Sequence, residues 1–144
     1  MRKSILTVLL FLVGTQCIQA QEVTLFDSEG EPVAYIAYEE ESTIYLWEGD
    51  PVAYLENDDG ETYVVGFNGK FLGWFEQGIM YDLNGNTVGA IEGAIDMFTQ
   101  FEPMKGFKEM TPFRQITPIP PLKPFWSNRW SSTPLIQFLS AGKK

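Results

Sequence analysis

Four copies of one short pattern constrain this chain more than any other feature of its sequence. Residues 30–36 read GEPVAYI, residues 49–55 read GDPVAYL, and weaker copies begin at Gly69 and Gly85. In all four copies an aliphatic residue stands three positions after the glycine, and a very small residue, alanine or glycine, follows it. The spacings of nineteen, twenty and sixteen residues between the glycines indicate a structural repeat over residues 23–92.

Each copy is predicted to form a β-hairpin. β-branched and aromatic residues, which favour strands, lie on both sides of each glycine. The glycine is expected at the left-handed position that follows a type I turn and produces a bulge in the returning strand. Polar runs at 39–42, 57–60 and 77–78 supply the turns between hairpins. The expected result is an eight-stranded up-and-down meander.

The small residue of each copy predicts how the hairpins come together. Neighbouring residues of a strand point to opposite faces of a sheet, so Ala34 and Tyr35 lie on opposite faces. Ala53, Gly73 and Gly89 occupy the place of Ala34 in the other copies. The same need for a very small residue in all four copies predicts crowding around a common axis. We therefore expect an all-β fold with four hairpins around a pseudo-fourfold axis.

The C-terminal part, residues 101–144, is expected to form an irregular strap packed on the repeat domain, residues 21–100. Its first thirty residues contain six prolines, which exclude a long helix or a central strand. They are also rich in aromatic residues, which flexible linkers lack. An extended, partly polyproline-like path is therefore expected. A short helix can follow, with Ser132 or Thr133 as its N-cap, Pro134 in its first turn, and Leu135–Leu139 as its body.

Charge is divided unevenly between these two parts. Residues 21–100 contain seventeen acidic residues and one basic residue, Lys70, which gives a formal charge of −16. Residues 101–144 contain seven basic and two acidic residues, which gives +5. The basic residues of the strap are expected to face the acidic repeats, although a basic tail can also bind an anionic partner. Because an acidic body repels phosphate, no nucleic-acid partner is expected.

The first twenty residues, MRKSILTVLLFLVGTQCIQA, are typical of a secretory signal peptide, with a basic start, an apolar run and a small final residue. We expect cleavage after Ala20 and a secreted or periplasmic protein. The alternative is a lipoprotein anchored at Cys17, although Gly14 and Gln16 depart from the residues preferred before a lipidated cysteine. No other apolar stretch is long enough to span a membrane, so no membrane span is expected.

Missing residue types limit the chemistry that the chain can perform. It contains no histidine, and Cys17 is its single cysteine. Ser–His and Cys–His pairs and histidine-containing metal sites are therefore excluded. No catalytic residue, cofactor or metal is expected.

Residues 57–61 and 82–86 faintly resemble calcium loops, but Asp, Asn and Gly are equally typical of hairpin turns. A pair of carboxylates across a cleft remains the one route to hydrolysis of a glycosidic bond.

Trp47 and Phe67 are the candidate ligand-binding residues. Both stand two positions before a repeat glycine, at a hairpin tip, where an exposed aromatic side chain is costly. Either the strap covers them, or they form a platform at the rim for a sugar or a cationic ligand. Trp126 and Trp130 are expected to anchor the strap rather than to contact a ligand.

The chain resembles the four-fold β-flower family of secreted bacterial proteins through an ordered succession of phrases, namely LFDSEGEPVAYI, IYLWEGDPVAYL, VVGFNGKFLGWFEQGIMYDLNGNTVG and PPLKPFWSNRWSS. The resemblance implies four hairpins around a pseudo-fourfold axis with an irregular C-terminal wrap, and it carries over no catalytic residue. The expected function is a non-catalytic, extracytoplasmic binding or interaction module, with a glycan or an envelope protein as its partner. The alternative is a carboxylate-dependent hydrolase that acts on cell-envelope or dietary glycans.

Overall fold

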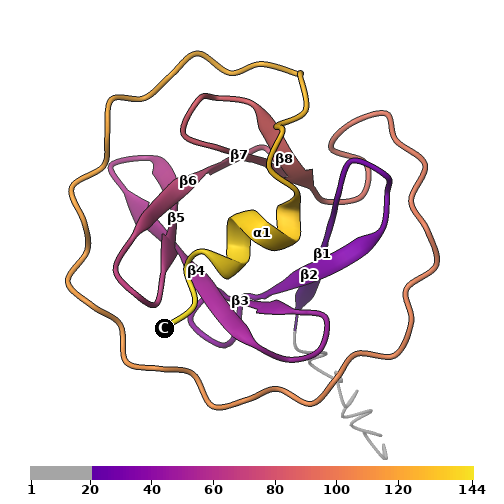
Figure 1. Ribbon diagram of the computed structural model, residues 1–144, viewed down its shortest axis with the longest axis horizontal. Coiled ribbons are helices and arrows are strands. Elements are labelled where there is room, and N and C mark those ends of the chain that lie inside the picture. The colour runs from indigo at the N-terminus through magenta and orange to yellow at the C-terminus, as the bar shows by residue number, and fades with distance from the viewer. Residues whose placement is uncertain (1–20) are drawn as a thin grey trace, which may run out of the picture.

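A computed structural model describes residues 21–144 as a closed antiparallel β-barrel with one short helix on its axis (Figure 1). The eight strands follow one another round the barrel in chain order. The all-β, up-and-down prediction is therefore confirmed, whereas the signal peptide and Cys17 lie outside the described residues. The elements are β1 (Glu22–Phe26), β2 (Pro32–Ala37), β3 (Thr43–Leu46), β4 (Pro51–Asp58), β5 (Glu61–Gly66), β6 (Phe71–Glu76), β7 (Ile79–Tyr81), β8 (Thr87–Ala90) and α1 (Leu135–Ser140).

The tip of each hairpin has the predicted glycine geometry. Gly30, Gly49, Gly69 and Gly85 have φ values of 73°, 106°, 85° and 83°, in the left-handed region that glycine adopts without strain. The pairing register shifts by one residue in the same place in all four hairpins. This shift is the expected consequence of a bulge next to a left-handed glycine.

The inward face of the barrel carries the small residues of the repeat. Ala34 and Ala53 are fully buried in the interior cluster, and Tyr35 and Tyr54 lie in separate clusters on the opposite face. The predicted separation of the small residue from the tyrosine after it is therefore confirmed. The aliphatic residue before the small one was expected on the face of the tyrosine, but Val52, Leu72 and Val88 lie in the interior cluster. The interior also contains Leu25, Ile36, Ile44, Leu55, Val64 and Met80.

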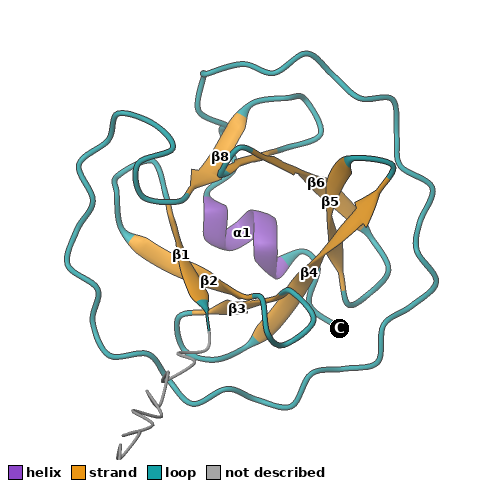
Figure 2. Ribbon diagram, turned by 180° about the vertical axis from the view of Figure 1, so that it is seen from behind, coloured by secondary structure: helices purple, strands orange, loops and turns teal. Residues whose placement is uncertain are grey.

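Helix α1 occupies the crowded part of the axis (Figure 2). A Cβ atom placed on Gly89 would lie 2.9 Å from the methyl carbons of Leu135, and one on Gly73 would lie 3.1 Å from Cζ of Phe138. The small residues thus make room for a helix, in addition to allowing the hairpins to converge. The sequence did not indicate this position for the helix.

The start of α1 corrects the predicted capping. Pro134 is the N-cap, in an extended conformation and with no side-chain capping bond, so neither Ser132 nor Thr133 caps the helix. The carbonyl oxygen of Pro134 accepts the first helical hydrogen bond, from the N–H of Phe138. Proline suits this boundary because it has no N–H to satisfy and its φ is already close to the helical value.

Residues 91–134, called the outer loop here, connect β8 to α1 by running round the outside of the barrel (Figures 1 and 2). The loop contains no helix and no strand apart from a single bridge between Trp130 and Thr87. The molecule is therefore built in concentric layers, with α1 on the axis, the barrel wall around it, and the outer loop as the outermost layer.

Candidate functional site

The outer loop contains a repeat of its own, nine residues long. Segments 98–106, 107–115 and 116–124 read FTQFEPMKG, FKEMTPFRQ and ITPIPPLKP. In each segment apolar residues stand at the first, fourth and seventh positions, a proline stands at the sixth, and a lysine or arginine stands at the eighth. The outer loop therefore has a sequence repeat of nine residues, next to a barrel built from repeated hairpins. Each nine-residue segment leads from one hairpin to the next.

Main-chain contacts at the hairpin tips hold this repeat in register. The nine-residue spacing brings N–H donors to successive tip carbonyls, from Gln100 to Gly30 (2.7 Å), from Glu109 to Gly49 (3.0 Å) and from Ser127 to Gly85 (2.8 Å). The intervening position is Pro118, which has no N–H. Correspondingly, within residues 21–144 no outer-loop N–H donates to Gly69.

The basic residues of the repeat point inward. The Nζ atom of Lys105 lies 4.5 Å from the ring centroid of Tyr35, and Cζ of Arg114 lies 3.9 Å from that of Tyr54. Because Tyr35 and Tyr54 occupy the same place in successive hairpins, these are equivalent cation–π contacts. The basic residue at the eighth position of the loop repeat therefore contacts the tyrosine five positions after the glycine of a hairpin.

Hairpin carboxylates pair with the basic residues of the outer loop. Lys105 and Lys123 of the repeat lie 2.9 Å from Glu22 and 2.9 Å from Glu76, respectively. Lys108, which lies outside the repeated basic position, is 2.6 Å from Glu22. Partial burial alone would raise the pKa of Glu22, but hydrogen bonds and charge from Lys108 and Lys105 lower it overall. The hydrogen bond from Lys123 is the main reason that the pKa of Glu76 is lowered. The positive charge of these loop residues is therefore directed toward the barrel.

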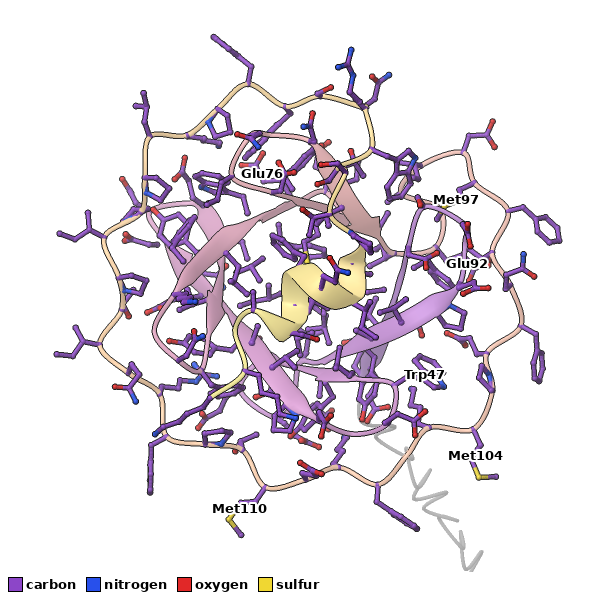
Figure 3. All side chains as sticks on the ribbon, in the orientation of Figure 1. Trp47, Glu76, Glu92, Met97, Met104 and Met110 are labelled. Atoms are coloured by element: carbon purple, nitrogen blue, oxygen red, sulfur yellow. The ribbon has the colours of Figure 1, made fainter. Side chains whose placement is uncertain are left out.

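The apolar residues of the repeat point the other way. Figure 3 shows Met104 and Met110 projecting outward from the loop, away from the barrel. Ten apolar side chains, each three residues after the last, have exposed fractions between 84 and 98 %. This period matches the three residues per turn of polyproline II and excludes the two-residue period of a strand. We call this row the apolar belt; it consists of Phe98, Phe101, Met104, Phe107, Met110, Phe113, Ile116, Ile119, Leu122 and Phe125.

The belt is larger than ordinary apolar exposure explains. At roughly 150 Å² for each large side chain, ten exposed side chains present about 1,500 Å² of apolar surface. The largest apolar patch on a typical soluble monomer measures about 300–600 Å², and larger patches mark interaction sites. No belt residue is charged, and the loop that carries the row runs round most of the barrel (Figure 1). The belt is therefore the strongest candidate for a functional surface.

The structure places Trp47 and Phe67 inside the outer loop. Trp47 is 8 % exposed, and its Nε1 donates a hydrogen bond to the carbonyl oxygen of Pro103 at 3.2 Å. Phe67 is 1 % exposed, and its ring centroid lies 5.4 Å from that of Tyr54. The two side chains belong to separate clusters and do not form one site. A ligand-binding role for them stays a prediction, and the belt does not include them.

Trp126 fixes the last quarter of the outer loop. Its ring stacks on Tyr81 with a centroid distance of 4.2 Å and an interplanar angle of 11°. It also meets the edge of Trp74 at 5.5 Å, and its Nε1 donates to Glu76 at 2.5 Å. Trp126 therefore acts as an anchor between the loop and the barrel.

The described carboxylates do not suggest a hydrolytic site. A general acid needs a raised pKa, whereas the pKa values of Glu22, Glu40 and Glu76 are all lowered, with lysine hydrogen bonds among the causes. The surface depression bounded by Tyr38 and Gln77 contains the carboxylate of Glu76, which Lys123 pairs. The depression beside Arg114 contains Glu39, Glu40 and Glu41, of which Glu40 pairs with Lys108. None of the carboxylates with a shifted pKa therefore has the raised value that a general acid needs.

The sequence at 82–86 forms an ordinary turn. The carboxylate of Asp82 accepts hydrogen bonds from the N–H groups of Asn84 and Asn86, both at 2.9 Å. Asp27 accepts two backbone bonds in the same way at the first hairpin. These aspartates stabilise hairpin tips, as Asx turns do.

Sequence reasoning missed the belt although its signal was present. The nine-residue repeat and its three-residue sub-period can both be read from the printed sequence. The aromatic residues of the segment also predict that it packs on the barrel, because aromatic side chains are usually buried. Trp126 does so, but Phe101, Phe107 and Phe113 point outward.

The fold and the belt define a class of protein: a small all-β repeat barrel, plugged by a helix and encircled by its own C-terminal segment. The chain belongs to a family within this class, because the family model described as "4-fold beta flower protein" matches residues 23–139. The family resemblance seen in the sequence is thereby confirmed. Searches of the curated proteins and of the solved structures found no match. Among residues 21–144 there is no helix long and apolar enough to cross a membrane.

Proposed function

We propose that this protein is a non-catalytic, extracytoplasmic interaction module whose contact surface is the apolar belt. The observation that carries the proposal is the row of ten apolar side chains at a spacing of three, each at least 84 % exposed. Placement outside the cytoplasm is part of the proposal and rests on the signal-like sequence of residues 1–20.

A protein partner fits the belt better than a glycan does. Sugar recognition needs hydrogen-bonding side chains beside an aromatic platform. The belt offers phenylalanine, isoleucine, leucine and methionine, none of which donates a conventional hydrogen bond. Apolar surfaces of this size are typical of contacts between proteins.

The belt can be altered without altering the fold, which makes the proposal testable. Its side chains contribute little to the core, so replacing Phe107, Ile116 and Leu122 together by serine should change the free energy of unfolding by less than about 1.5 kcal/mol. A matched control replaces three exposed outer-loop residues outside the belt, Glu102, Glu109 and Thr111, by serine.

The measurement is the apparent size of the protein in an extract of the native envelope, by size-exclusion chromatography. The wild type and the control should elute as the same complex, and the belt variant should elute as a free, folded monomer. The proposal fails if the belt variant stays in the complex, or if the control leaves it.

A further inference from the structure

We infer that the partner is a concave protein that encloses the belt from all sides, in the form of a ring or an open barrel with an apolar inner wall. This inference rests on the proposed function, because it specifies what the belt binds. The decisive observation is direction: Met104 and Met110 point away from the barrel, whereas Trp47 and Glu76 lie inside the loop (Figure 3). The exposed row faces outward around most of the rim.

A second copy of the chain cannot cover such a rim. Two convex rims meet along a short stretch, with two or three belt side chains from each copy. At roughly 150 Å² per side chain, this contact buries about 300–450 Å² on each copy. A stable interface buries about 800 Å² on each partner, so pairing of copies leaves most of the belt exposed.

A lipid bilayer does not fit the height of the belt. The hydrocarbon core of a bilayer is about 30 Å thick, whereas the belt is a single row of side chains. For the row to enter hydrocarbon, one end of the barrel would have to enter with it. The surfaces on both sides of the row carry exposed carboxylates, with Glu29 and Glu48 at the hairpin tips and Glu39 and Asp58 at the opposite turns. Burying such charges in lipid is strongly unfavourable.

The enclosing wall is expected to be apolar, because the charged side chains of the loop contact the barrel and do not face outward. Lys105, Lys108, Arg114 and Lys123 are all engaged with barrel side chains. The outward row itself has neither charge nor hydrogen-bonding groups, so an apolar wall leaves no polar group of the row unpaired. A charged wall would instead be desolvated without compensation.

The size of the enclosure follows from the length of the row. From Phe98 to Phe125 the loop has twenty-seven steps. At about 3.1 Å per residue this is a path of about 85 Å. The row runs from the hairpin tip at Gly30 to the tip at Gly85, which is about three-quarters of the way round the four hairpins. The rim is therefore roughly 35 Å across at the backbone and roughly 45 Å across with side chains. A wall of this diameter can be one large ring-shaped protein or a closed oligomer.

The test uses single cysteines at Phe98, Phe107, Ile116 and Phe125, which are nine residues apart around the rim. Labelling by N-ethylmaleimide is read for each site by mass spectrometry, so Cys17 does not interfere. The rate in native cells is compared with the rate for the purified protein. Controls away from the belt are Gln137→Cys, on the exposed side of α1, and Asp58→Cys, at the turn between β4 and β5.

Enclosure predicts at least tenfold slower labelling in cells at all four belt positions and unchanged labelling at both controls. A photo-crosslinking amino acid at the same four positions should join the chain to one and the same second protein. Protection at only one or two neighbouring positions, adducts between copies of this chain, or adducts to phospholipid would each overturn enclosure while leaving the belt as a contact surface. Full reactivity at all four positions would overturn both enclosure and the proposed function.

Discussion

The guanidinium carbon of Arg114 lies 3.9 Å from the ring centroid of Tyr54, and this contact joins two different repeats. Tyr54 belongs to the hairpin repeat, in which copies are sixteen to twenty residues apart, and Arg114 belongs to the nine-residue repeat of the outer loop. The same contact recurs between Lys105 and Tyr35. A long segment without helix or strand is thereby held in a defined path, with its charged side inward and its apolar side outward.

Removing this contact should loosen the loop. We expect Arg114→Ala to lower the free energy of unfolding by about 1–2 kcal/mol, because a partly desolvated cation–π contact is lost. Chemical denaturation measures the change. Lys143→Ala is the matched control, since the side chain of Lys143 is 53 % exposed and lies 3.5 Å from its partner Asp50. Equal effects of the two substitutions would show that Arg114 does not anchor the loop.

The crowding of the axis should make its small positions intolerant of larger side chains. Ala53 is fully buried and faces the interior that α1 fills, so Ala53→Leu should lower the free energy of unfolding by about 1–3 kcal/mol through overpacking. Ser28→Leu, at an exposed hairpin tip, serves as the control. Thermal unfolding at the same temperature for both variants would contradict the assignment of Ala53 to the axis.

The hairpins were predictable because their signals are local. A left-handed glycine such as Gly49 leaves a mark in the sequence at the place where it acts. The position of α1 was not predictable, since Leu135, Phe138 and Leu139 form a short apolar face that can pack on any apolar surface. The belt was not predictable for a different reason. Apolar side chains are usually buried, and only their three-residue period distinguishes this row from an ordinary core segment.

Docking of the outer loop should depend on pH in both directions. The pKa values of Glu22, Glu40 and Glu76 are lowered from 4.5, so their stabilising effect is complete above pH 4.5 and is lost as pH falls through the lowered values. The pKa of Lys108 is raised from 10.5, so its contribution is complete below pH 10.5 and is lost as pH rises through the raised value.

Hydrogen exchange at the N–H groups of Gln100, Glu109 and Ser127 reports this docking, because each donates to a hairpin tip. After correction for the intrinsic dependence on pH, protection should be constant from pH 4.5 to pH 10.5 and should decrease outside that range. Protection that stays constant through the acid titration of all three carboxylates would show that the ion pairs do not hold the loop.

Residues 1–20 predict that the protein is exported. We expect the protein isolated from its native host to begin at Gln21 and to carry no lipid, because residues 1–20 have the pattern of a cleavable signal peptide. Intact-mass measurement checks both statements. A mass that corresponds to an acylated Cys17 at the first position would replace this expectation with a lipid-anchored protein.

The belt should be exposed in the isolated protein and covered in the cell. Methionine oxidation by peroxide measures both states, because Met104 and Met110 are 95 and 94 % exposed whereas Met80 is fully buried. In the purified protein we expect Met104 and Met110 to oxidise much faster than Met80. In intact native cells we expect both to be protected at least several-fold relative to the purified protein. Slow oxidation of Met104 and Met110 in the purified protein, or equally fast oxidation in cells, would contradict the claim.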